Sequence, residues 1–92
     1  MTHYLKTWPV YFEAVWDLKK TFELRKNDRN FKVGDRLQLQ EYDPTTKTYS
    51  GRFSVVNVTY VLNANQVDGL DPDYCIIGFH LYANLGGDEK DM

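Results

Sequence analysis

The chain has 92 residues, of which 15% are aromatic, with one cysteine and a formal net charge of −2. This length is enough for one small domain with one core, and a single cysteine excludes both an internal disulfide framework and a cysteine-based zinc cluster within one chain. The mild acidity argues against non-specific binding to duplex DNA, which depends on neutralising many phosphates.

The chain shows no signal for membrane insertion or export. No apolar run approaches 18 residues, and the N-terminal segment Met1–Tyr4 lacks the apolar part of a signal peptide. We therefore expect a soluble cytoplasmic protein without a membrane partner. Residues 1–85 are predicted to form a single domain, and the glycine-led segment 86–92 to form a flexible polar tail.

The first third of the chain predicts a short strand and then an amphipathic helix. The strand is expected over residues 4–6. Pro9 suits the first turn of a helix because the N–H that proline lacks has no helical partner there. Apolar residues then recur at spacings of three and four. We expect a helix over Pro9–Leu18 that packs on a sheet through Phe12, Val15 and Trp16.

After the helix the hydrophobic period changes to two. Strands are expected over residues 20–26, 36–42, 49–62 and 74–82, with Gly51 marking a bulge or bend. In the last strand, Ile77, Phe79 and Leu81 should share one face. One helix followed by four or five strands predicts an α+β domain. A bent sheet that closes into a small barrel would protect the strand edges best, although composition does not distinguish a barrel from an open sheet.

The segment from residue 19 to residue 29 stands out by its charge. Its sequence is Lys-Lys-Thr-Phe-Glu-Leu-Arg-Lys-Asn-Asp-Arg, which carries five basic and two acidic residues in a protein of net charge −2. A local positive patch on an acidic protein suggests a binding site. Phe22 and Leu24 alternate with Glu23 and Arg25, so the strand has an apolar and a polar face.

Lys20, Glu23 and Arg25 are candidates to face one cleft. Arginine offers a planar fork for a phosphate, a carboxylate or a base edge, and a glutamate accepts hydrogen bonds from a base amino group. The alternative is an ordinary strand in which Glu23 and Arg25 form a surface ion pair worth about 0–1 kcal/mol.

The loop that follows this strand supplies further candidates for ligand binding. In one interpretation, Asp28 caps backbone N–H groups and Arg29 points to the ligand. In the other, Asn27 and Asp28 simply form the turn.

Other residue types give weaker signals. His3 and His80 lack a metal-ligand spacing, so we expect neither a metal nor a cofactor. Cys75 begins an apolar strand and is predicted to be a small core residue. At most one of four aromatic residues is expected to be a stacking platform for a base, the others being core: Trp8, Trp16, Tyr42 or Tyr74.

Several segments between His3 and Leu81 carry a family resemblance. They are His3-x-Leu5-Lys6, Tyr11-Phe12, the run from residue 20 to residue 29, Phe31, Val33-Gly34-Asp35, Leu37-x-Leu39-x-Glu41-Tyr42 and residues 58–62. Together they resemble a small bacterial and phage family of ASCH domains in the PUA-like superfamily. The resemblance implies a PUA-like β-barrel of about five to six strands, with one N-terminal helix beside a cleft that binds RNA or modified nucleosides.

Two departures from the family pattern bear on function. Some distant ASCH proteins are hydrolases that act on acylated cytidine or cleave RNA. The resemblance maps the lysine that follows the helix of these hydrolases to Lys20. It maps their threonine three residues later to Glu23, so this chain lacks the hydroxyl nucleophile at that position. Leu18 stands where the family tends to have a glycine. It must avoid the left-handed conformation or bear a cost of roughly 1 kcal/mol.

Three hypotheses follow. In the first, a monomeric binding module holds a nucleotide or a short single-stranded RNA segment in a cleft lined by Lys20, Glu23, Arg25 and Arg29. In the second, Lys20 and Glu23 are the general acid and base of a small hydrolase acting on a modified nucleoside. In the third, the chain is a phage or mobile-element protein that binds a host protein, which a large exposed apolar patch would favour.

Overall fold

The computed structural model describes residues 1–87. In chain order its elements are β1 (Thr2–Thr7), α1 (Pro9–Trp16), β2 (Phe22–Lys26), β3 (Arg36–Asp43), β4 (Thr48–Asn63), the 3₁₀-helix η1 (Ala64–Gln66) and β5 (Tyr74–Leu85). The predicted helix and the predicted strands are present, with ends that shift by up to three residues, so the α+β class is confirmed. Most of the predicted tail, residues 88–92, lies outside the described residues. Within residues 1–87, no helix has the length and hydropathy needed to cross a bilayer.

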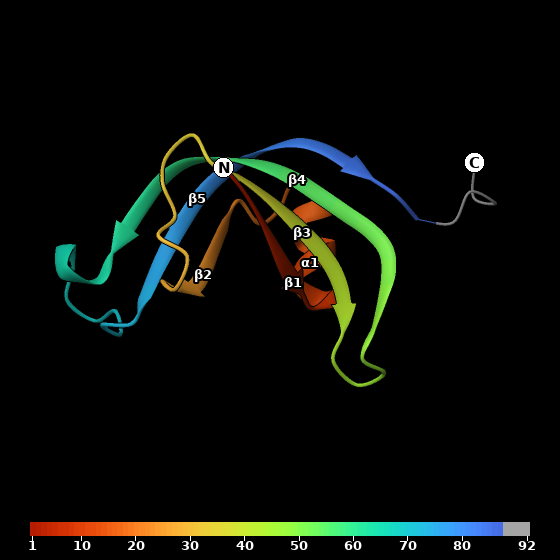
Figure 1. The fold of residues 1–92 in the computed structure, drawn as a ribbon, viewed down its shortest axis with the longest axis horizontal. Helices are drawn as coiled ribbons and strands as arrows, with labels where there is room; N and C mark the ends of the chain where they lie inside the picture. The colour runs from red at the N-terminus through yellow and green to blue at the C-terminus, as the bar shows by residue number, and fades with distance from the viewer. Residues whose placement is uncertain (88–92) are drawn as a thin grey trace.

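The five strands form one curled sheet in the order β1-β3-β4-β5-β2. β1 runs parallel to β3, and every other neighbouring pair is antiparallel. The sheet bends into an arch with β1 and β2 at its two edges (Figure 1). These edge strands do not pair with each other in the part of the chain that is described. The sheet is therefore a half-barrel, and the closed barrel that was predicted is only partly formed.

The helix α1 lies on the concave side of the arch and packs against β3 and β4 (Figure 1). Phe12 and Val15 are completely buried, as predicted, whereas Trp16 is only half-buried. Trp8 and Tyr11 remain about half exposed at the N-terminal end of the helix. The helix thus buries a narrower stripe than its apolar sequence predicts, and it leaves two aromatic rings in contact with solvent.

The helix ends two residues before the predicted boundary, in a Schellman motif. The N–H of Lys19 donates to the carbonyl oxygen of Ala14 at 2.8 Å, and the N–H of Leu18 donates to that of Val15 at 3.0 Å. Leu18 has a φ of 65°, so it adopts the left-handed conformation that glycine favours. The N–H of Lys20 also reaches the Ala14 oxygen, at 3.0 Å. This turn therefore fixes Lys20 two residues before the start of β2.

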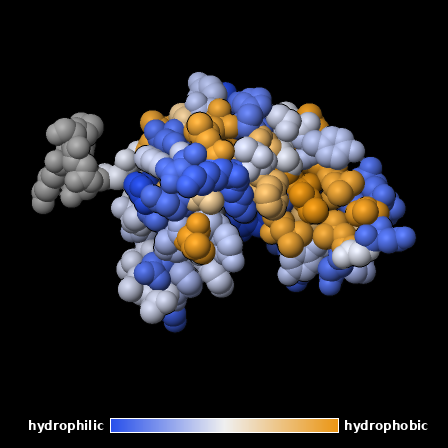
Figure 2. All heavy atoms as spheres, turned by 180° about the vertical axis from the view of Figure 1, so that it is seen from behind, coloured by the Kyte–Doolittle hydropathy of each residue, from blue (hydrophilic) through white to orange (hydrophobic). Residues whose placement is uncertain are grey.

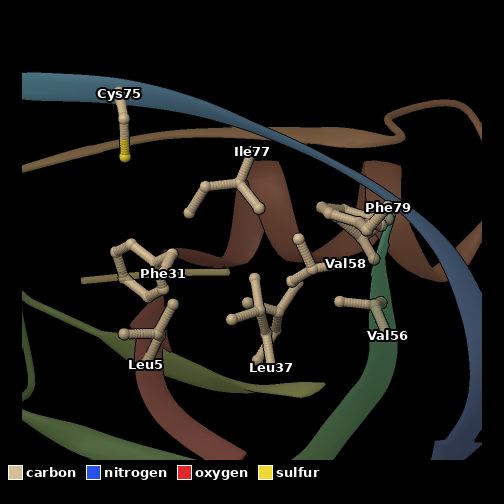
Figure 3. Packing of buried hydrophobic residues seen from close by; sticks show 10 residues of the cluster. Leu5, Phe31, Leu37, Val56, Val58, Cys75, Ile77 and Phe79 are labelled. Carbon is tan, nitrogen blue, oxygen red and sulfur yellow. The ribbon is translucent and has the colours of Figure 1, made fainter. Parts of the chain in front are cut away.

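The hydrophobic core fills the space between the concave face of the sheet and α1 (Figure 3). It comprises Leu5, Val15, Phe31, Leu37, Leu39, Val56, Val58, Cys75, Ile77 and Phe79. Cys75 is fully buried, as predicted, and this burial raises the pKa of its thiol. Leu81 packs against the same cluster, which confirms that it shares a face with Ile77 and Phe79.

Arg52 ties α1 to the sheet. Its Nε donates to Glu41 Oε1 and its Nη2 to Glu13 Oε2, both at 3.1 Å. The guanidinium also lies 4.9 Å from the centre of the Trp16 ring. Burial opposes ionisation of Glu41, but the hydrogen bonds from Arg52 and Ser50 outweigh it and lower the pKa of Glu41. Arg52 thereby links α1 to β3 and β4, the two strands against which the helix packs.

Candidate functional site

A cleft of about 640 Å³ opens between the end of β1, the start of α1 and β2. The surface is visibly hollowed between the part that carries β2 and the rest of the molecule (Figure 2). The polar lining residues are Lys6, Thr7, Lys20, Glu23 and Arg25. The apolar and aromatic ones are Trp8, Tyr11, Phe22, Leu24 and Tyr74. The cleft therefore lies at the open side of the half-barrel, where the two edge strands approach each other.

The strand β2 buries its polar face and exposes its apolar face, which reverses the usual arrangement. Glu23 is only 4% exposed, whereas Phe22 and Leu24 are 49% and 54% exposed. The predicted alternation is present, but period-two patterning does not say which face points inward. A carboxylate tolerates burial only when it is paired with cations and hydrogen-bonded, so the neighbours of Glu23 explain the reversal.

Glu23 lies between two cations. Lys20 Nζ donates to Glu23 Oε1 at 2.5 Å and to the carbonyl oxygen of Phe22 at 2.6 Å. Arg25 Nε donates to Glu23 Oε2 at 2.9 Å. We call these three residues the Lys20–Glu23–Arg25 triad. Both oxygens of the buried carboxylate are satisfied, and the triad carries a formal net charge of +1.

Two arginines cross the gap between the edges of the sheet. Arg25 Nη2 donates to the carbonyl oxygen of Lys6 at 2.7 Å and to Thr7 Oγ1 at 3.3 Å. Arg29 Nη1 donates to the carbonyl oxygen of Tyr4 at 3.2 Å. Tyr4 and Lys6 are alternate residues of β1, so both carbonyl groups face the same edge. The arginines thus satisfy backbone acceptors that an unpaired strand edge would leave open.

The three loop residues predicted to bind ligand are not among those that line the cleft. The backbone N–H of Asn27 donates to the carbonyl oxygen of Asp73 at 2.8 Å, and its side chain donates to Asn63 Oδ1 at 3.3 Å. Asp28 is exposed, with Oδ1 4.0 Å from Arg29 Nε. Of the six predicted residues, the structure therefore brings Lys20, Glu23 and Arg25 together in the cleft and leaves the other three beside it.

The aromatic wall of the cleft was only partly anticipated. Trp8 and Tyr74 line it, whereas Trp16 packs on Phe12 and Tyr42 packs on Tyr49. The rings of Trp8 and Tyr11 stack with centroids 6.4 Å apart and an angle of 27° between their planes. Lys20 Nζ lies 5.9 Å from the Tyr11 ring and 5.1 Å from the Phe22 ring.

Five lining residues were not predicted: Lys6, Thr7, Tyr11, Phe22 and Leu24. Tyr11 is adjacent to Phe12, and helical spacing alone does not say which of the two rings is buried. Phe22 and Leu24 were placed on the apolar face of a strand, where burial is the ordinary outcome. Thr7 carried no signal, since an isolated threonine next to a tryptophan is common at the end of a strand.

A protein-family model described as "Domain of unknown function (DUF3850)" matches residues 2–79. The chain belongs to this family. The matched stretch contains β1, α1, β2, β3 and β4 together with every residue that lines the cleft. The cleft of this DUF3850 protein is therefore built entirely from the family's own domain. No curated protein matches the chain.

Proposed function

We propose that this DUF3850 protein binds a nucleotide or a short single-stranded RNA segment in the cleft beside β2. The observation that carries the proposal is the pairing of the Lys20–Glu23–Arg25 triad with an aromatic wall in one concave site. Ligand pockets usually combine apolar walls with a few convergent polar groups. A nucleotide matches both parts, because a flat base is joined to an anionic phosphate.

The net charge of the triad supports an anionic ligand. Lys20 and Arg25 contribute two positive charges against one from Glu23. The ammonium group of Lys20 has three N–H donors, and two of them are used within residues 1–87. Arg25 engages Glu23, Lys6 and Thr7 through Nε and Nη2, and within the same residues Nη1 has no such partner. Donors on both cations therefore remain for a phosphate oxygen or a base edge.

The aromatic wall supports a ligand with a flat ring. Trp8 and Tyr11 are 53% and 51% exposed although they are large and mostly apolar. Stacking of a base on an aromatic side chain is worth about 1–3 kcal/mol and tolerates any base. A protein that exposes stacked rings next to free cationic donors has the chemistry of a single-stranded nucleic-acid site.

The proposal extends to the relatives and the setting of the protein. A curled half-barrel with one helix beside a cleft fits the PUA-like, ASCH-type architecture that the sequence resembles. A nucleotide ligand fits a cytoplasmic protein that acts as a monomer. A formal net charge of −2 argues against a duplex DNA ligand, whose binding depends on neutralising many phosphates.

A hydrolase acting on an acylated nucleoside or on RNA is the second candidate. Its support is the direct contact of Lys20 Nζ with Glu23 Oε1 at 2.5 Å, since a lysine and a glutamate in hydrogen-bond contact are able to exchange a proton. The substitution of glutamate for the hydroxyl-bearing residue of the hydrolytic relatives makes binding without turnover our preferred outcome.

A thermal-shift screen of nucleosides, nucleotides and short RNAs tests the proposal, because a ligand that binds only the folded state raises the melting temperature. Each hit is then titrated against Lys20→Ala, Arg25→Ala and Arg29→Ala. We expect the first two changes to weaken binding by about 1.5–3 kcal/mol, the range for a charged hydrogen bond. Arg29→Ala is the control, because Arg29 bonds to β1 outside the cleft lining.

Two results would contradict the binding proposal. One is the absence of any stabilising nucleotide or RNA in the screen. The other is turnover of an acylated nucleoside by the wild-type protein, at a rate that Lys20→Ala lowers by about 100-fold or more while affinity changes little. That result would favour the hydrolase.

A further inference from the structure

The outer face of the sheet carries an aromatic residue on each side of a glycine. Gly78 of β5 is paired directly with Phe22 of β2 on one side and with Tyr60 of β4 on the other. Directly opposed residues of antiparallel strands point to the same face. Phe22, Gly78 and Tyr60 therefore form one row across three strands, which we call the glycine row. Its two aromatic residues are 49% and 57% exposed.

The backbone of Gly78 does not require a glycine. Its φ is not among the positive values that other glycines of the chain adopt. A Cβ atom built at position 78 would meet nothing closer than 3.7 Å, which is ordinary van der Waals contact. A glycine inside a strand costs stability and often marks a place where a ligand approaches the backbone closely. The absent side chain leaves room above the Gly78 backbone, bordered by Thr59 Oγ1 and the Cβ atom of Tyr60.

The width of that space suits a flat ring. The backbones of β2 and β4 are two strand spacings apart, about 9.4–9.8 Å. A flat ring that contacts an aromatic ring on each face needs about 7–8 Å between them. Small rotations of Phe22 and Tyr60 toward each other would bring both into contact with a planar group above Gly78.

The glycine row is continuous with the cleft. Phe22 belongs to both, and Leu24 of the cleft lining is two residues farther along β2, where it pairs with Ile76 of β5. Apolar residues gather on the side of the molecule that carries β2 (Figure 2). Lys20 Nζ lies 5.1 Å from the Phe22 ring, so a cation stands where the cleft meets the row.

We propose that the glycine row stacks a second base of a single-stranded nucleic acid whose neighbouring nucleotide occupies the cleft. The inference rests on the proposed function and makes it more specific, because the preferred ligand becomes a strand of two or more nucleotides. The phosphate between the two bases would pass Lys20. This cation at the junction favours a nucleic-acid strand over an apolar peptide as the occupant of the row.

The test compares 5′-mononucleotides with the ribodinucleotides that extend them at either end, by titration calorimetry. On wild-type protein, a dinucleotide should bind about 5- to 150-fold more tightly than its mononucleotide, as expected for one added stacking contact. Gly78→Val fills the row with a side chain that suits a strand, and Tyr60→Ala removes one of its walls. Each should reduce the dinucleotide advantage to less than about twofold and leave mononucleotide affinity unchanged. Ala83→Val is the control, because it places a valine on β5 outside the row. It should keep the full affinity advantage of the dinucleotide over the mononucleotide.

The outcomes separate this inference from the proposed function. Mononucleotide binding without a dinucleotide advantage, or an advantage that survives both row variants, overturns the glycine row alone. Absence of binding by any nucleotide or dinucleotide overturns both. A wild-type dimer that Gly78→Val or Tyr60→Ala converts to a monomer in sedimentation experiments would assign the row to a contact between two copies and overturn its nucleic-acid role.

Discussion

Arg25 Nη2 lies 2.7 Å from the carbonyl oxygen of Lys6, so one side chain joins the two edge strands of the half-barrel. The same guanidinium binds the buried carboxylate of Glu23 through Nε. Arg25 therefore has a structural role at the edge of the sheet in addition to its place in the cleft. Ligand binding and sheet closure depend on one group, and an experiment on Arg25 must measure both.

Replacing Arg25 with alanine should destabilise the fold even without ligand. Arg25→Ala removes a cation from Glu23 Oε2 and a donor from the Lys6 carbonyl. We expect a loss of about 1.5–3 kcal/mol in the free energy of unfolding, the range for hydrogen bonds to charged groups. Urea denaturation measures it. Lys26→Ala is the matched control on β2, because Lys26 is exposed. Equal losses in the two variants would show that the link across the gap contributes nothing.

The left-handed residue at the end of α1 offers a route to higher stability. Leu18 has a φ of 65° and is 65% exposed, so its side chain contributes little packing while its backbone is strained. Leu18→Gly should raise the free energy of unfolding by about 0.5–1 kcal/mol after the larger unfolded-state entropy of glycine is counted. Leu18→Ala keeps the conformational cost and should change little. Thermal or urea unfolding distinguishes the two, and a less stable Leu18→Gly variant would contradict this account.

Much of the fold followed from hydrophobic periodicity, which reports local structure directly. The helix start at Pro9, the strand around Leu37 and Leu39 and the burial of Cys75 were all predicted. The parallel pairing of β1 with β3 was not, because it joins segments that are distant in sequence. The open side of the half-barrel escaped prediction for the same reason, since it depends on which strands become the edges.

The candidate site was half predicted. Charge pattern and family resemblance singled out Lys20, Glu23 and Arg25, and these three converge. Arg29 was a candidate to face the ligand, and its guanidinium donates to the carbonyl oxygen of Tyr4 beside the cleft. A loop arginine binds whichever acceptor the fold brings near, which the sequence does not specify. Alternation gave two faces for β2 but not their direction. Which face of β2 points inward depends on the ion pair of Glu23 with Lys20. This pair joins the strand to the turn that follows α1.

Stability should fall in acid through carboxylates that are bound in the folded state. The hydrogen bond from His3 to Asp35, at 2.8 Å, lowers the pKa of Asp35 below its usual 3.8, partial burial opposes this, and the N–H of Lys32 assists it. A carboxylate with a lowered folded pKa contributes its full stability above the unfolded value and loses it as pH falls through the folded one.

The Asp35 contribution should therefore be nearly complete above about pH 5 and be lost progressively as pH falls below 3.8 and through the lowered pKa of the folded state. Urea denaturation between pH 7 and about pH 2.5, a range that brackets carboxylate titration, measures it. Asp35→Asn should be less stable at neutral pH and lose less on acidification. Asp28→Asn is the control, because Asp28 is exposed. An Asp35→Asn variant with the wild-type acid slope would contradict the assignment.

Nucleotide binding in the cleft should depend only weakly on salt. The triad carries a net charge of +1, so the site has room for about one to three phosphate contacts. Single-stranded ligands lose about 0.7 of a logarithmic unit of affinity per contact for each tenfold rise in salt, which predicts a slope of about −0.7 to −2. Titrations at several salt concentrations measure this slope. A slope close to that of a duplex-binding protein would be inconsistent with a compact cleft.

Adjacent aromatic residues of α1 should separate stability from binding. Phe12 is completely buried and Tyr11 is 51% exposed in the cleft wall. Phe12→Ala should cost about 3–5 kcal/mol of unfolding free energy, as buried phenylalanine truncations do, with nucleotide affinity of the folded protein unchanged. Tyr11→Ala should cost less than about 1 kcal/mol of stability but weaken nucleotide binding by about 1–3 kcal/mol, the value of one stacking contact. Each variant is the control for the other, and urea denaturation and titration calorimetry are applied to both.

A Tyr11→Ala variant with full affinity would remove the aromatic wall from the binding site. A Phe12→Ala loss below about 1 kcal/mol would show that this helix face is not core.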